Sequence, residues 1–231
     1  MGYVFAAPPQ AVVAVDGSSD LLPVHRIYCV GRNYAEHQKE MGFSGREAPF
    51  FFMKPADAVL PVPFGSFGEM PYPGETGNLH HEIELVVAIG KAGRNIPAVD
   101  AARHIYGYAV GLDMTRRDLQ FALRDKGRPW DVAKGFDCSA PISPVKPIGV
   151  TGEVTSAQIF LNVNGQRRQA SDVAKLIWNV NETIEHLSKF YELKPGDLVY
   201  TGTPEGVGAV VKGDELEGGV AGIGTLKVRI V

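Results

Sequence analysis

Two glutamates on one face of a single predicted strand are the strongest chemical feature of the sequence. The segment HEIELVVAIG at residues 81–90 has the clearest strand pattern in the chain. Because successive side chains of a strand point to opposite faces, Glu82 and Glu84 share one face, about 7 Å apart. Apolar residues continue this face and fill the other one. A second predicted strand, YGYAVGLD at residues 106–113, ends in a third acid, Asp113.

Carboxylates buried at this spacing repel each other, and their burial is costly unless a cation compensates. Three carboxylates at strand ends form a hard oxygen site for Mg²⁺ or Mn²⁺, with water or substrate completing the coordination. The same pattern fits a solvated strand face, so both interpretations stay open at this point. His80 and His81 precede the strand, but their spacing is not that of a standard zinc site, and we do not expect either to be a ligand.

A histidine and a glutamate three residues apart form a second candidate group. Residues 34–41 predict a short helix between two glycines, and the spacing places His37 and Glu40 on one face of it. A carboxylate beside an imidazole orients it as a general base that acts on water. The glycines would let residues 34–45 close as a lid when substrate binds. The alternative is an ordinary solvated helix surface.

Further polar residues follow Asp113 along the chain. Arg117 and Gln120 repeat the three-residue spacing on a predicted helix, where an arginine can hold a substrate carboxylate with two hydrogen bonds. The alternative is again an exposed helix face. Lys134 follows two apolar residues and is a candidate buried cation. The loop TGTPEGVG at residues 201–208 lacks the Gly-Lys-Ser/Thr ending of a P-loop, although its backbone could still hold a small anion.

The elements that must position these residues are mostly short strands. Glycines and prolines are spread along the chain and separate it into short segments. The pair Asn164-Gly165 between two extended runs predicts a hairpin. Thr115 is expected to cap the helix over residues 116–126, and an amphipathic pattern predicts a helix over residues 180–191. Further strands are predicted at residues 26–30, 50–53, 198–202 and 225–231, a short helix is expected after Pro97, and residues 55–80 are expected to form a long irregular connection.

Composition sets limits on the class of protein. The chain has 231 residues, of which 45% are hydrophobic and 21% charged, and a formal net charge of −3. Without a basic surplus, we expect no nucleic-acid partner. Two cysteines, Cys29 and Cys138, indicate a reducing compartment rather than a disulfide framework, and no apolar run is long enough to span a membrane. We expect a cytoplasmic protein with an N-terminal arm at residues 1–24 and a single catalytic domain at residues 25–231.

An ordered set of segments resembles the fumarylacetoacetate hydrolase family. Each segment alone is weakly specific, but together they cover most of residues 26–231 in the family order. The segments are IYCVGRNYAEHQKEMG, PFFFMKPADAVLP, GNLHHEIELVVAIGK, GYAVGLDMTRRDLQ, PWDVAKGFDCSAPISP and LKPGDLVYTGTPEGVG. The resemblance implies an α+β, strand-dominated fold with a mixed β-roll core, one divalent Mg²⁺ or Mn²⁺ ion per chain, and a homodimer.

The same resemblance implies a role for each candidate residue. The metal-binding acids of the family fall on Glu82, Glu84 and Asp113. Its catalytic residues fall on His37, Glu40 and Lys134. Its substrate contacts fall on Arg117, Gln120 and Thr203. These assignments strengthen the functional interpretation of each residue over the solvated-surface alternatives.

The implied reaction is metal-dependent hydrolysis of a C–C bond in an acylpyruvate, with fumarylpyruvate giving fumarate and pyruvate as the leading expectation. His37 would activate the water, and the metal would stabilise the enolate of pyruvate as it leaves. The same metal chemistry would also serve an oxaloacetate decarboxylase or a 2-hydroxymuconate-type isomerase. A second carboxylate-binding group would separate these activities, and Arg32 and Arg46 are its candidates. The alternative from another class is a non-enzymatic binding protein of β structure, which predicts no divalent ion.

Overall fold

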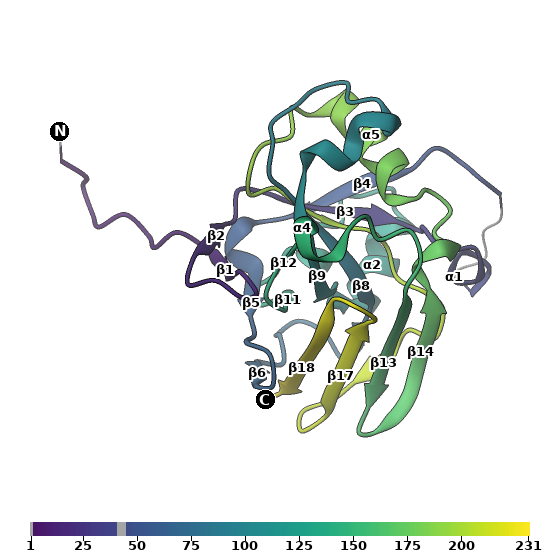
Figure 1. Cartoon of the computed structure of the whole chain (residues 1–231). Helices are drawn as coiled ribbons and strands as arrows, with labels where there is room; N and C mark the ends of the chain where they lie inside the picture. Colours follow the sequence, from purple (N-terminus) through teal and green to yellow (C-terminus); the bar gives the residue numbers. More distant parts are fainter. Residues whose placement is uncertain (1, 41–44) are drawn as a thin grey trace.

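A mixed sheet of eight strands forms the centre of the protein (Figure 1). The computed structural model describes residues 2–40 and 45–231. Strands β3 and β15 pair in parallel, as do β5 and β11, and the other neighbours are antiparallel. In order across the sheet the strands are β4 (Phe50–Lys54), β3 (Ile27–Gly31), β15 (Leu198–Tyr200), β8 (Ile83–Ile89), β9 (Ile105–Leu112), β11 (Ala140–Ile142) and β5 (Val59–Pro61), with β12 (Lys146–Pro147) also paired to β9.

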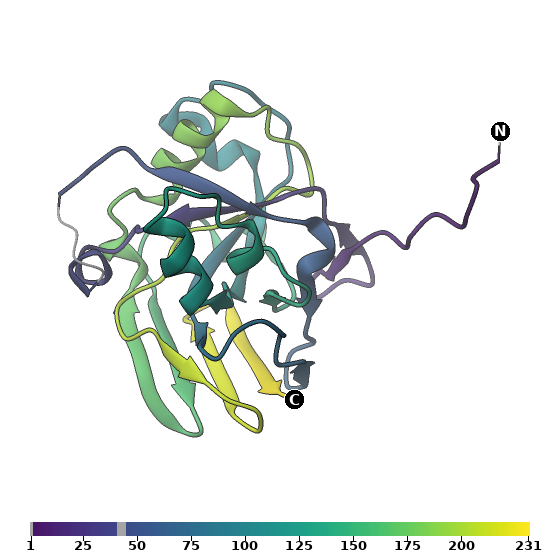
Figure 2. The ribbon, with the colours of Figure 1, turned by 180° about the vertical axis from the view of Figure 1, so that it is seen from behind.

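Three smaller sheets complete the strand structure. A five-stranded sheet lies below the central one in both views (Figures 1 and 2), in the order β14 (Gln166–Asp172), β13 (Gln158–Val163), β17 (Glu215–Val220), β18 (Gly224–Ile230) and β6 (Phe67–Met70). A three-stranded sheet has the order β10 (Thr115–Arg116), β7 (Leu79–His81) and β16 (Gly208–Val210). Strands β1 (Val12–Ala14) and β2 (Leu21–Pro23) pair with each other.

The helices are short and lie around the sheets. The longest described one, α5 (Val180–Phe190), starts with a capping box made by Asn179 and Glu182. The other helices are α1 (Ala35–Glu40), α2 (Arg117–Arg124), α3 (Asp131–Lys134) and α4 (Ile148–Thr151), with 3₁₀ turns at Ala56–Ala58, Ala98–His104 and Val173–Lys175. The predicted strand-dominated α+β fold with a curled mixed sheet is confirmed.

Strand β8 is buried on both faces, and its sequence alternation decides what each face contacts. One face packs into the larger apolar cluster through Ile83, Leu85, Val87 and Ile89. The other face contributes Val86 and Ala88 to a smaller cluster that also contains residues of β1 and β2. Glu82 and Glu84 lie on this second face and are only 5% and 2% exposed. The solvated-face alternative is therefore wrong, and the two acids are buried.

Two predicted segments differ from the structure because of pairing between distant parts of the chain. Residues 55–80 are not a purely irregular connection, since β5 pairs with β11 and β6 pairs with β18, both in parallel. The expected strand over residues 81–90 is interrupted at Glu82, where β7 ends and β8 begins. Short strands of this kind are defined by their remote partners rather than by their own sequence.

The helix expected to begin after Thr115 starts instead at Arg117. Thr115 lies in β10, pairs with His80, and donates its hydroxyl to the carbonyl of Asp113 rather than capping the helix. Strand pairing has therefore replaced the local capping interaction. The helix ends at Arg124, two residues before the predicted end.

Other local predictions agree with the structure. Asn164 and Gly165 form the turn of the β13–β14 hairpin with φ of 51° and 76°, the left-handed values that favour this residue pair. The amphipathic segment forms α5, close to its predicted bounds. The start of the described chain extends away from the body before β1 (Figure 2). Within the described residues, no helix has the length and apolar character needed to cross a membrane.

Gly111 provides a test of the strand pair that carries the acids. It lies opposite Glu84 in the β8–β9 register, and an added Cβ would come within 2.5 Å of Val86 Cγ2 and 2.6 Å of Tyr200 Cε1. We predict that Gly111→Ala lowers the free energy of unfolding by about 1–3 kcal/mol, the usual cost of overpacking. Urea titration followed by circular dichroism measures this change. The control is Gly149→Ala, whose Cβ meets nothing within 4 Å, and an equally small effect in both variants would contradict the prediction.

Candidate active site

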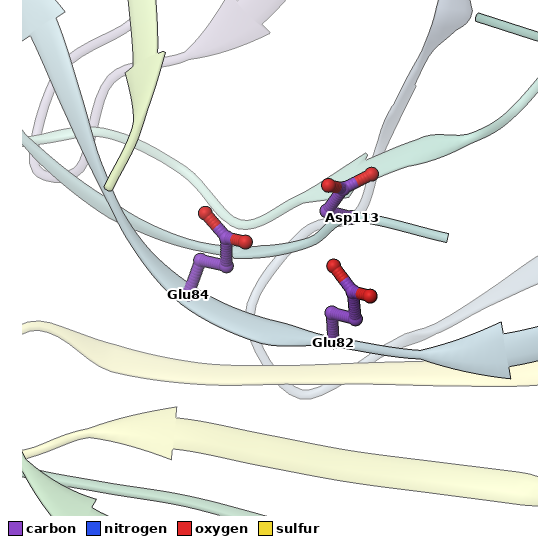
Figure 3. A group of neighbouring side chains, drawn as sticks. All are labelled: Glu82, Glu84 and Asp113. Carbon is purple, nitrogen blue, oxygen red and sulfur yellow. The ribbon is translucent and has the colours of Figure 1, made fainter. Parts of the chain in front are cut away.

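The β8–β9 ladder brings three carboxylates together (Figure 3). Ile83 lies opposite Leu112, and one step further the Asp113 amide donates to the Glu82 carbonyl at 2.9 Å. Asp113 therefore lies across from Glu82 on the face that also carries Glu84. One oxygen from each of the three acids lies within 4.8 Å of those of the other two. The predicted juxtaposition of the three acids is thus present in the structure.

Glu82 is neutralised by two buried cations. The guanidinium of Arg117 hydrogen bonds to one carboxylate oxygen, and Lys134 Nζ donates to the other at 2.9 Å. Burial favours the neutral acid, but the positive charges of Lys134 and Arg117 outweigh it and hold the pKa of Glu82 well below its usual range. Glu82 is therefore a carboxylate at neutral pH.

Asp113 also has two cationic neighbours. Lys134 Nζ donates to Asp113 Oδ2 at 2.7 Å, and Lys54 Nζ lies 2.8 Å from Oδ1. The third hydrogen-bond partner of the Lys134 ammonium is Thr115 Oγ1, at 2.7 Å. Burial lowers the pKa of Lys134, but Asp113 and Glu82 more than compensate and raise it. Lys134 is thus the buried cation that the sequence predicted, fixed between two of the acids.

Lys54 is a site residue that the sequence-based reasoning missed. It ends β4 and is fully enclosed, and its ammonium also donates to the backbone carbonyls of Met114 and Lys134. The sequence did contain an indication, because Lys54 directly follows the apolar run FFFM. A lysine that is buried in such a place needs a partner of opposite charge. That partner, Asp113, comes from a strand far along the chain.

Glu84 differs from the other two acids because it makes no ion pair within the part of the chain that the structure describes. Its carboxylate accepts a hydrogen bond from the Gly202 amide at 2.7 Å. Burial raises the pKa of Glu84 well above its usual value, and the negative charges of Asp113 and Glu82 add to the effect. A divalent cation among the three acids would supply Glu84 with a positively charged partner. The donor set, with carboxylate oxygens only, suits Mg²⁺ or Mn²⁺.

The two neighbouring histidines are outside this group of acids. His81 Nδ1 lies 3.0 Å from Gln169 Oε1, and burial lowers the pKa of its imidazole. His80 Nε2 lies 3.0 Å from Asn78 Oδ1, and burial together with the charge of Arg117 lowers its pKa to about 4. Both are therefore neutral at pH 7 and engaged in side-chain hydrogen bonds with Asn78 and Gln169.

The His37–Glu40 pair forms across one face of α1, as its spacing predicts. His37 Nδ1 lies 3.2 Å from Glu40 Oε2, and Glu40 Oε1 accepts the amide of Gly206 at 2.9 Å. His37 is only 5% exposed and lines the same pocket as the three acids, so the solvated-helix alternative does not hold for it. Residues 41–44 of the predicted lid lie outside the described residues, and the closing of the lid stays a prediction.

The pocket also contains the predicted substrate contacts. Arg117 Nη1 donates to Gln120 Oε1 at 2.6 Å, so the two residues share one face of α2. Thr203 donates its hydroxyl to the Ile83 carbonyl at 2.8 Å and accepts from Gln169 Nε2 at 2.9 Å. The pocket lining comprises Val30, Gly31, Arg32, His37, Phe50, Phe52, Glu82, Glu84, Asp113, Arg117, Gln120, Phe121, Arg124, Trp130, Lys134 and Thr203.

Of the two arginines considered for a second carboxylate-binding group, only Arg32 lines this pocket. The guanidinium of Arg46 lies 4.0 Å from the Trp178 ring centre and donates to Glu182 at 2.7 Å. Arg124, at the end of α2, lines the pocket but was not among the candidates. The sequence spacing could have predicted this position, because a residue seven places after Arg117 lies on the same helix face two turns later.

The glycine-rich loop after β15 serves the chain's own carboxylates. Its Gly202 amide holds Glu84, its Gly206 amide holds Glu40, and both glycines have positive φ, at 105° and 90°. These two amides are therefore engaged within the chain and do not form a cradle for a separate anion. One loop connects the acid site to the His37–Glu40 pair.

The fold and site define a strand-dominated α+β protein with a buried three-carboxylate centre at the base of a mixed polar and aromatic pocket. Residues 26–231 match the family model described as "Fumarylacetoacetate (FAA) hydrolase C-terminal". The chain therefore belongs to the fumarylacetoacetate hydrolase family.

Individual relatives cover most of the chain. A fumarylpyruvate hydrolase from Ralstonia sp is 50% identical over 185 residues, which is 80% of this chain and 93% of the relative. The crystal structure of a fumarylpyruvate hydrolase from Pseudomonas aeruginosa, in complex with Mn²⁺ and pyruvate, matches with a TM-score of 0.98 at 56% identity and covers 100% of this chain and 99% of the other. The mitochondrial oxaloacetate tautomerase FAHD1 of Rattus norvegicus is 41% identical over 204 residues, covering 88% and 90%.

Glu84 gives a direct test of the metal site. We predict that Glu84→Gln weakens Mn²⁺ binding by roughly tenfold or more, because the number of ligand charges sets the affinity. The metal-free variant should melt no lower than the metal-free wild type, since the substitution removes a buried acid without an ionic partner. Calorimetric titration and thermal melting measure the two effects.

Glu69→Gln, which changes an exposed glutamate of β6, is the matched control for the loss of one negative charge. Unchanged Mn²⁺ affinity in Glu84→Gln would remove this residue from the metal site.

Proposed function

We propose that this protein is a metal-dependent hydrolase that cleaves the C–C bond of an acylpyruvate, with fumarylpyruvate as the substrate. The observation that carries the proposal is that the three acids and His37, which Glu40 contacts from outside the pocket lining, meet in one pocket. The identities of 50% and 56% to fumarylpyruvate hydrolases support the choice of substrate. A non-enzymatic binding protein would have no need for a general base beside the acids.

The metal ligands in this proposal are Glu82, Glu84 and Asp113. A bound Mg²⁺ or Mn²⁺ ion would act as a Lewis acid toward the 2-oxo acid end of the substrate. The support is the buried Glu84, which makes no ion pair within the described residues and whose pKa is raised by burial, beside Glu82 and Asp113, together with the Mn²⁺ ion in the Pseudomonas aeruginosa relative.

In the hydrolytic step, His37 takes a proton from a water molecule, whose oxygen bonds to the substrate carbonyl distal to the pyruvyl group. The C–C bond on the pyruvyl side then breaks, and its electron pair leaves with pyruvate as the enolate. Protonation of that carbon gives pyruvate, and the other product is fumarate. Glu40 holds His37 through Nδ1, which leaves Nε2 as the atom that receives the proton.

Four further residues complete the proposed site. Arg117 and Gln120 orient the substrate from α2, and Thr203 contacts it from the loop after β15. Lys134 contributes positive charge and fixes the orientation of Glu82 and Asp113 through its hydrogen bonds. Because all these groups are buried or nearly so, their positions are set before substrate arrives.

The oxaloacetate tautomerase at 41% identity makes a second reaction worth testing, since one set of acids can serve either chemistry. A turnover panel separates them, with fumarylpyruvate, acetylpyruvate and oxaloacetate offered to the Mn²⁺-loaded protein. Product analysis then distinguishes C–C hydrolysis, loss of CO₂ and keto–enol exchange. Fumarylpyruvate as the best substrate supports the proposal, whereas turnover of oxaloacetate alone overturns it.

The general-base assignment is tested by His37→Ala. We predict that hydrolysis of fumarylpyruvate falls by about 10²–10⁴-fold, mainly in kcat, because no base remains to activate water. Mn²⁺ affinity should be unchanged, since His37 is not among the three acids. A slow, metal-driven loss of CO₂ from oxaloacetate should persist.

All three quantities are measured on one preparation, with His104→Ala as the control, because His104 is a histidine away from the pocket. Loss of Mn²⁺ binding would make His37 a ligand, and unchanged hydrolysis would exclude it as the base.

We further propose a homodimer in the cytoplasm that takes part in the breakdown of aromatic compounds, with residues 25–231 as the catalytic domain and residues 1–24 as an arm. The support for the dimer is the apolar start of the arm, where Tyr3, Val4 and Phe5 are 86%, 98% and 76% exposed. Such a run is typical of a segment that a second chain covers.

The arm is tested by replacing Tyr3, Val4 and Phe5 with serine. We predict that the wild type elutes as a dimer and that the triple variant dissociates at least tenfold more readily, because its apolar contact area is lost. Light scattering after size exclusion, over a range of concentrations, measures this. The control replaces the exposed Val99 and Val150 with serine. A monomeric wild type would disprove the dimer, and a stable dimer of the triple variant would disprove the role of the arm.

A further inference from the structure

One face of α2 forms a wall of the pocket from the acids outward. The residues that line the pocket from this helix are Arg117, Gln120, Phe121 and Arg124. Arg117 contacts Glu82 at the first of these positions. Arg124 follows seven residues later, which is about 10.5 Å along the axis at 1.5 Å per residue. The helix therefore places a second guanidinium in the same pocket, two turns away from the acid site.

Arg32 brings another guanidinium to this pocket from the end of β3. Its guanidinium carbon lies 4.8 Å from the centre of the Phe50 ring, and that of Arg124 lies 4.8 Å from the Phe121 ring. Both rings line the pocket, so each cation rests against an aromatic wall. Burial lowers the pKa of Arg32, Glu47 opposes this, and the positive charge of Arg124 lowers it further. Both cations line the same pocket, and the charge of Arg124 acts on Arg32 there.

We propose that Arg124 and Arg32 bind the distal carboxylate of a 2-oxo dicarboxylic acid whose 2-oxo end occupies the acid site. The inference rests on the proposed function and adds the group that selects the substrate by length and charge. Three bonds of an extended chain span about 3.5 Å, so the six bonds between the carboxyl carbons of a seven-carbon diacid span about 7 Å. The two backbone positions on α2 are about 10.5 Å apart along the axis. Because arginine side chains are long, their guanidinium groups can meet the two ends of a ligand with this shorter span. A four-carbon diacid spans only half of it.

Each of the two arginines has an acid of the chain nearby, Glu47 for Arg32 and Asp125 for Arg124. Arg124 donates from Nε and Nη2 to Asp125 Oδ1 at 3.0 and 2.9 Å. The carboxylate of Asp125 is 65% exposed, and such solvent-exposed pairs contribute little stability. A ligand carboxylate that approaches from the pocket can therefore share or replace this contact. In the proposed complex the ligand carboxylate would contact two guanidinium groups, whereas Asp125 contacts one.

The test compares two ligands that differ only in the distal carboxylate. 2-Oxopimelate has the seven carbons and both carboxyl groups, and 2-oxoheptanoate carries a methyl group in place of the second one. Neither has the second carbonyl group needed for hydrolysis, so calorimetry on the Mn²⁺-loaded protein reports binding alone. The variants are Arg124→Met and Arg32→Met. The control is Arg128→Met, which removes one positive charge outside the pocket. Methionine is as good a helix former as arginine, so Arg124→Met is expected to leave α2 intact.

We expect the wild type and Arg128→Met to bind 2-oxopimelate at least about tenfold more tightly than 2-oxoheptanoate, the effect of one charge-assisted contact. Arg124→Met should lose this preference, Arg32→Met should reduce it, and affinity for 2-oxoheptanoate should stay constant in all variants. A wild type without the preference, or an Arg124→Met variant that keeps it, overturns the assignment. If Arg128→Met loses the preference equally, the assignment is also overturned, because the overall positive charge of the protein would then explain the preference. If the preference is present but fumarylpyruvate is not cleaved, the proposed reaction fails and the binding subsite stands.

Discussion

The mutual repulsion of three buried carboxylates is the constraint on which the rest of the site depends. The β8–β9 register forces Glu82, Glu84 and Asp113 onto one enclosed face, where isolated negative charges are costly. Three buried cations of the chain, Lys54, Lys134 and Arg117, match the three acids in number, but their ion pairs all go to Glu82 and Asp113. Within the described residues, Glu84 has no ion pair. This uneven distribution leaves Glu84 as the acid that a hard divalent cation would pair with.

The loop after β15 couples this centre to the proposed base. The Gly202 amide donates to Glu84, and the Gly206 amide donates to Glu40, which in turn contacts His37. Backbone donors at positive φ require glycine at these positions, because a Cβ on Gly202 would come within 2.6 Å of Asn33 Cβ and one on Gly206 within 2.1 Å of the Arg168 carbonyl oxygen. A displacement of this loop would therefore move both groups at once, so their relative positions are protected by backbone geometry.

Sequence patterns predict those parts of the site that follow from local periodicity. Alternation along one strand places Glu82 and Glu84 on one face, and helical spacing pairs His37 with Glu40. The position of Lys54 after the apolar run FFFM indicated burial, but its partners could not be predicted, because Asp113 and the two carbonyls come from distant segments. The expected cap at Thr115 was wrong for a related reason, since β10 pairs with β7 across the fold. Local propensity is overridden wherever a short segment finds a remote partner.

The helix α2 links the acid site of this protein to the proposed binding site for the distal carboxylate. Its first turn is fixed from both sides, by Arg117 on Glu82 and by Asp118, which accepts hydrogen bonds from Thr76 at 2.6 Å and the Gly77 amide at 3.0 Å. Every later position on the same face is then set by the helical rise, without further adjustment. Substitution at the far end changes what the pocket accepts without moving the acids. The contact with the acid site and the proposed contact with the distal carboxylate therefore lie on one helix, at separate positions along it.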